Sequence, residues 1–177
     1  MSEQMNEYIG TWLKITRNED QIGAVLRAHL WIENSLNEIL QVRTHEDWSG
    51  KVYGGQFDFL DKVRIAASFG LIGDDLFQPL QRLGEIRNRL AHKIDSVLTE
   101  KQQEEFLSTI PKYCQDQAVK FLTKAELSAA DDDFFEAQDV HRLEGMKGRP
   151  ALSTSFLSGL LALQFELFSI LDEMETG

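Results

Sequence analysis

In the stretch LFQPLQRLGEIRNRLAHKI, residues 76–94, apolar side chains recur three, four or seven positions apart. Positions with this spacing share one face of an α-helix, which turns once every 3.6 residues. The face consists of Leu76, Leu80, Leu83, Leu90 and Ile94. Long helical patterns of this kind dominate the chain, and no stretch alternates β-branched with polar residues. The sequence therefore predicts an all-α fold, a helical bundle of about six to eight helices.

Helix caps and breaks extend this prediction along the chain. We expect helices at about 8–15, 19–42, 57–69, 74–96, from 99 to about 124, and 152–174. The end signals are Asn18 or Asp20 before the second of these helices, Gly70 or Gly73 after the third, a Thr99–Gln102 capping box, and a break or restart at Pro111.

One domain is expected over residues 1–177, because this length suits one hydrophobic core better than two. Its core is expected at about 19–125, followed by an acidic turn and linker at 126–150 and an apolar C-terminal helix at 151–177. The last helix is apolar almost all round from Phe156 to Leu171, so it must be buried on more than one side. Either the domain's own core or a partner subunit can provide that cover.

Charge and cysteine content narrow the classes of function. The formal net charge is −11, which opposes a strongly basic surface for nucleic acid. Residues 51–100 carry seven basic and seven acidic side chains, so this block is neutral and allows a local basic patch. Cys114 is the only cysteine, so no disulfide can form within the chain. Because the N-terminus lacks a signal-peptide pattern and residues 156–171 are too short to span a bilayer comfortably, we expect a cytoplasmic protein without membrane association.

Four polar residues near the end of the helix at 74–96 are candidates for a site. Asn88 and His92 lie one turn apart on the face opposite the apolar one, with Arg89 beside them. They are therefore expected to cooperate at one site, although a hydrogen-bonded pair with a capping or interface role explains the spacing equally well. Arg87 falls in the middle of the apolar face and is expected to point elsewhere.

A cation on an apolar face needs a partner, because an unpaired buried charge is very costly. The apolar face of the helix at about 19–42 consists of Ile22, Leu26, Leu36 and Leu40. Glu33 lies in the middle of this face, with His29 one turn away. The sequence predicts a buried ion pair between Glu33 and Arg87 across packed helices, with His29 stacked one turn from it. His29 and Glu33 also have the spacing of two metal ligands, but the sequence offers no third ligand, so we expect neither a metal nor a cofactor.

The segment Arg87-Asn88-x-x-Ala91-His92 resembles the signature of the HEPN superfamily, in which an Arg, usually followed by Asn, precedes a His by four to six residues. Residues 20–38, 59–72 and 86–92 are together similar to its mannitol-operon-repressor-like branch. The resemblance spans roughly residues 20–95 and implies a helical-bundle homodimer. In active members, Arg and His near a dimer cleft cleave RNA without metal, which would make Arg87 and His92 the active pair, supported by Asn88.

Two functions follow as hypotheses. The first is a dimeric, metal-independent ribonuclease of toxin or defence type, in which imidazole transfers protons and arginine stabilises phosphoryl charge. Helical geometry then favours Arg89, beside Asn88 and His92, as the residue that meets phosphate, whereas the resemblance favours Arg87. The alternative is a non-catalytic regulatory or interaction protein resembling the mannitol operon repressor, with an RNA or protein partner. The acidic charge favours this alternative, and no helix-turn-helix with a basic recognition helix is evident.

Overall fold

The computed structural model describes residues 20–44, 57–92, 97–117, 152 and 154–176. Within these ranges the backbone forms helices and loops and no β-strand, which confirms the predicted all-α class. The helices are α2 (Gln21–Arg43), α4 (Phe59–Ser68), α5 (Asp74–His92), α6 (Glu100–Leu107) and α9 (Thr154–Thr176), with a further helical stretch at 112–117. The helix predicted at 8–15 and the linker predicted at 126–150 lie outside the described residues.

Local side-chain chemistry sets the helix ends, largely where the sequence predicts them. Asp20 caps α2, its carboxylate accepting a hydrogen bond from the Gly23 amide at 2.9 Å. Thr99 and Gln102 form the predicted capping box at the start of α6, each backbone amide donating to the other side chain. Such caps satisfy amides that have no partner within the helix, and each contributes about 1 kcal/mol.

Of the two glycines expected near the end of α4, Gly70 is the one that ends it. Its φ of 67° is left-handed, a conformation that glycine adopts without a steric penalty from Cβ. The Gly70 amide donates to the Ala67 carbonyl, and the Leu71 amide donates to the Ala66 carbonyl, each at 2.9 Å. This pair of hydrogen bonds is a Schellman motif, which turns the chain out of α4 and toward α5.

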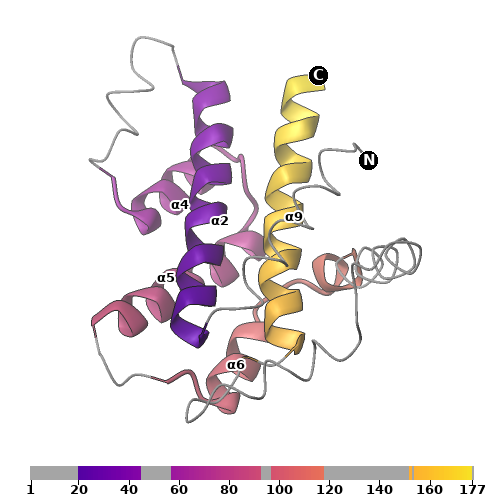
Figure 1. Ribbon diagram of the computed structural model, residues 1–177. Coiled ribbons are helices and arrows are strands. Elements are labelled where there is room, and N and C mark those ends of the chain that lie inside the picture. The colour runs from indigo at the N-terminus through magenta and orange to yellow at the C-terminus, as the bar shows by residue number, and fades with distance from the viewer. Residues whose placement is uncertain (1–19, 45–56, 93–96, 118–151, 153, 177) are drawn as a thin grey trace, which may run out of the picture.

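The core lies between α2 and α9, which pack side by side, while α4 and α5 cover another side of α2 and α6 packs against α9 (Figure 1). The α9 side chains of Phe156, Leu160, Leu163 and Leu167 are at most 1% exposed within the single chain. The core interpretation of this helix is therefore confirmed for these residues. None of the described helices is long and apolar enough to cross a membrane.

Candidate functional site

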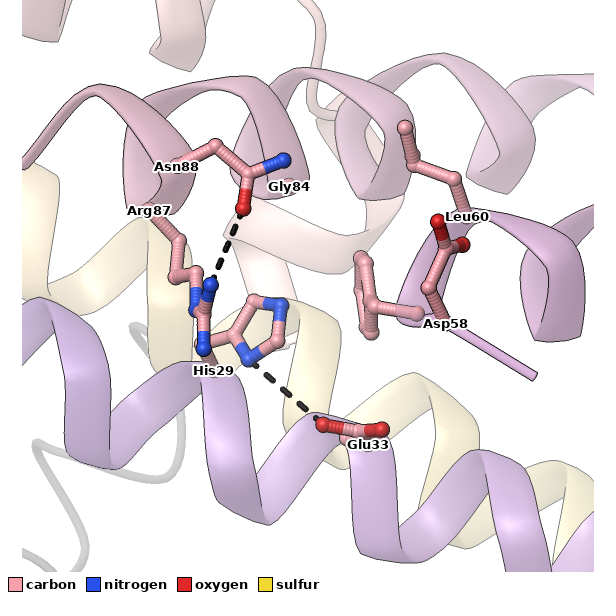
Figure 2. Close-up of a pocket in the computed structure, with 8 residues that line it drawn as sticks. His29, Glu33, Asp58, Leu60, Gly84, Arg87 and Asn88 are labelled. Atoms are coloured by element: carbon pink, nitrogen blue, oxygen red, sulfur yellow. Dashed lines mark hydrogen bonds and ion pairs between the residues drawn. The ribbon is translucent and has the colours of Figure 1, made fainter. Parts of the chain in front are cut away.

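A pocket of about 200 Å³ lies where α2, α4 and α5 meet (Figure 2). It is lined by His29 and Glu33 of α2, by Asp58, Phe59 and Leu60 at the start of α4, and by Gly84, Arg87 and Asn88 of α5. Gly84 lets α5 approach α4 closely, since a Cβ there would stand 3.0 Å from Leu60 Cδ2 and 3.1 Å from Phe59 Cδ1. The pocket is thus built from three helices that are separate in sequence, with its polar groups supplied mostly by α2 and α5.

The carboxylate of Glu33 pairs with Lys62 of α4, not with Arg87. Lys62 Nζ donates to Glu33 Oε1 at 2.5 Å, and the Lys62 side chain is only 6% exposed. Between the described residues, no ion pair joins Glu33 to Arg87, so the predicted contact is not formed. The physical reason is that the more deeply buried cation, the Lys62 ammonium, needs the carboxylate more than the half-buried Arg87 does.

Arg87 points toward the pocket and toward its neighbour Asn88, although the sequence predicts that it points away from Asn88. Its Nη1 donates a hydrogen bond to Asn88 Oδ1 at 3.0 Å (Figure 2). Successive helix positions differ by about 100° in direction, but the long arginine side chain can follow the helix surface while its guanidinium reaches a polar partner. Arg87 and Asn88 therefore belong to one site, which corrects the expectation drawn from helical geometry alone.

His29 is a buried imidazole without a hydrogen bond. Its residue is 3% exposed, its ring lies 4.1 Å from the Phe59 ring between centroids, and neither ring nitrogen has a hydrogen-bond partner. The Glu33 Oε2 atom stands 3.8 Å from His29 Nδ1, too far for a hydrogen bond. The pKa of His29 is lowered to about 4, chiefly by burial. The negative charge of Glu33 opposes this shift, and the positive charges of Arg87 and Lys62 add to it. The imidazole is therefore neutral at neutral pH.

The predicted neighbours Arg89 and His92 do not line the pocket. His92 is exposed at the last residue of α5, Asn88 is exposed one turn before it, and Arg89 is half-buried. The hydrogen bond that Asn88 accepts comes from Arg87. The structure thus joins Asn88 to Arg87 and leaves the imidazole of His92 on the open end of the same helix.

Sequence reasoning missed Lys62, although a signal for it was present. Lys62 stands three residues after Phe59 and four before Ala66, and all three are buried on one face of α4. A lysine inside an apolar face requires a carboxylate, because an unpaired buried charge is very costly. Among the described residues, no group of three or more His, Cys, Asp or Glu side chains is arranged to hold a metal ion.

Comparisons with family models, with curated proteins and with solved structures found no match for this chain. Proposals about its function therefore depend on its own residues and on the resemblance of its Arg87–His92 segment to the HEPN signature.

Proposed function

We propose that the protein is a HEPN-like helical homodimer that cleaves RNA without a metal ion, in a toxin or defence role. One observation carries most of the proposal: Arg87 and Asn88 are hydrogen-bonded to each other at a pocket, and His92 is exposed on the same helix. The three residues that resemble the superfamily signature thus lie within two turns of α5, and two of them already act on each other.

Each group has a proposed role in phosphodiester cleavage. His92 would act as general acid or base, the role that imidazole serves most often in enzymes. Asn88 holds one edge of the Arg87 guanidinium at 3.0 Å, and the remaining N–H groups of that planar side chain suit phosphate oxygens. This support favours Arg87 over Arg89 as the phosphate-binding arginine. In a two-fold dimer, a second α5 would bring another set of these groups to the same cleft.

Incubating the purified protein with total RNA in excess chelator tests the proposal. We expect loss of RNA integrity, abolished in His92→Ala, with unchanged thermal unfolding because His92 is exposed. Arg87→Ala should be folded but inactive, whereas Arg89→Ala should keep activity. Arg64→Ala, an exposed arginine on α4, is the matched control and should cleave like the unaltered protein. Cleavage that survives His92→Ala, or that the chelator stops, would contradict the proposed chemistry.

The second candidate is a non-catalytic regulatory or interaction protein of the mannitol-repressor type. The net charge of −11 favours it, because such a charge repels RNA phosphates over most of the surface. If the unaltered protein leaves RNA intact under every condition while remaining folded and dimeric, this candidate takes the place of the ribonuclease.

A further inference from the structure

The pocket beside Arg87 contains the His29 imidazole, whose burial without hydrogen bonds lowers the stability of the fold. Both nitrogens of His29 lack hydrogen bonds although the residue is 3% exposed and lines the pocket. An unsatisfied buried polar atom destabilises the folded chain, so phenylalanine at this position would pack on Phe59 with less penalty. A ligand that hydrogen-bonds to the ring would account for an imidazole here.

The charges and the size of the pocket argue against free anions and against large ligands. Glu33 and Asp58 place two carboxylates in the lining and Arg87 places one guanidinium there, so the pocket does not favour a free anion. Its volume of about 200 Å³ is below the roughly 300–1,000 Å³ of ordinary small-molecule sites, so it suits a single small ring. Phe59 and Leu60 supply the apolar walls that such a ring requires.

We propose that the pocket binds one unstacked nucleobase whose Watson–Crick edge carries an amino group beside an unprotonated ring nitrogen, that is, adenine or cytosine. Glu33 Oε1 is held by Lys62, which leaves Oε2 as an acceptor for the exocyclic amino group. The neutral imidazole of His29, 3.8 Å from that oxygen, donates its N–H to the ring nitrogen. Guanine and uracil carry a carbonyl beside an N–H group on the corresponding edge, so they oppose this arrangement.

This inference rests on the proposed function in one respect: the phosphate next to the bound base is placed at Arg87, the arginine proposed to bind phosphate. Arg87 is half-buried and lines the pocket, and both His29 nitrogens are buried, so the guanidinium would have to turn outward toward a phosphate before a base could reach the imidazole. Single-stranded RNA exposes bases that can leave the stack and enter a pocket of this kind. The pocket would then select the nucleotide next to the bond that is cleaved.

Nucleoside binding separates the base pocket from the cleavage chemistry. Adenosine, cytidine, guanosine and uridine are titrated into the unaltered protein, His29→Phe and His92→Ala, and the imidazole NMR signals are followed. We expect adenosine and cytidine to bind at least about tenfold more tightly than the other two, the order expected of a matched hydrogen-bond pair. His92→Ala should retain this preference, because His92 does not line the pocket. His29→Phe should lose it while unfolding at the same or a higher temperature.

Equal binding of all four nucleosides, or none, overturns the base pocket, as does a His29→Phe variant that keeps the preference. Mapping cleavage sites in RNA then distinguishes the two proposals. Cleavage without regard to adenine or cytosine leaves the ribonuclease in place and rejects the pocket. Selective nucleoside binding without any cleavage supports the pocket and rejects the ribonuclease. Binding of oligonucleotides but not of nucleosides overturns the claim that the base itself is recognised.

Discussion

Lys62 brings an ammonium group into the interior between α2 and α4, and Glu33 is the residue that offsets its charge. The contact is closer to a buried pair than to a surface salt bridge, since the two side chains are 6% and 22% exposed. Removing one partner of such a pair leaves the other charge poorly solvated, whereas replacing both with apolar or neutral groups avoids that penalty. The pair also fixes the direction of Glu33, whose second oxygen remains beside His29.

Glu33→Gln is expected to lower the free energy of unfolding by about 3 kcal/mol, the lower end of the range for breaking a buried pair, because Glu33 is partly exposed. The double change Glu33→Gln with Lys62→Met should recover most of that loss. Urea denaturation of the single and double variants measures both effects. Arg64→Ala removes the exposed pair with Asp61 and should change stability by less than about 1 kcal/mol. A double variant no more stable than Glu33→Gln would count against the pairing.

The buried imidazole of His29 should make stability depend on pH. Its pKa is about 4 in the folded chain and near 6.5 when unfolded, so the unfolded state binds more protons between these values. Stability is therefore complete above about pH 6.5 and falls as the pH drops toward 4. Between pH 7.5 and 5 the loss assigned to His29 is about 2 kcal/mol.

The difference between the unaltered protein and His29→Phe isolates this effect, because other titrating groups contribute equally to both. Denaturant midpoints at pH 7.5 and pH 5 should diverge, with the phenylalanine variant losing less stability. Midpoints that fall in parallel would show that His29 titrates alike in the folded and unfolded chains.

At the scale of the helices, periodicity was a good guide to position and a poorer guide to orientation. On α2, the expected apolar face included Ile22 and Leu26, but both are only half-buried, while Val25 and Ala28 are at most 2% exposed. The buried surface of α2 differs from the expected face because α2 packs against α9 as well as against α4 and α5. A helix with neighbours on several sides buries more of its circumference than one apolar face. The Tyr113 hydroxyl donates to Asp75 at 2.9 Å and joins the stretch at 112–117 to the start of α5.

At the scale of the whole molecule, the burial of α9 limits how a second copy could pack. Most apolar residues of this helix are buried within one chain, where α9 packs against α2, α5 and α6, so they offer little surface for association. The end of α5, where Asn88 and His92 are exposed, leaves a surface that a second copy could cover.

We therefore expect a homodimer formed through the α5 face, since closed two-fold dimers are the commonest oligomers. Light scattering at micromolar concentration should report twice the chain mass of 20.2 kDa. Two separate variants test whether the α5 face forms the interface. Asn88→Arg, on α5, should weaken the dimer. Arg64→Glu, on α4, is the control and should leave the dimer intact. A mass of 20.2 kDa for the unaltered protein would remove the basis for a cleft shared by two subunits.

The sequence alone determined the helical class and the capping box of α6, because these depend on neighbouring residues. It also narrowed the start of α2 to Asn18 or Asp20 and the end of α4 to Gly70 or Gly73, and the structure has Asp20 and Gly70 at these positions. It also singled out His29, Glu33, Arg87 and Asn88, which do line one pocket. These features are local, since caps and helical faces are set within a few residues of the backbone they act on.

Only the tertiary structure decided which of these groups meet. Glu33 could pair with any cation brought near it, and the packing of α4 against α2 brings Lys62 to it. Likewise, the direction of the Arg87 side chain and the isolation of His29 follow from the space left between three helices, which no single helical pattern contains. Charge partners in an interior are chosen by non-local packing, because an ion pair forms only where separate elements bring its atoms within reach.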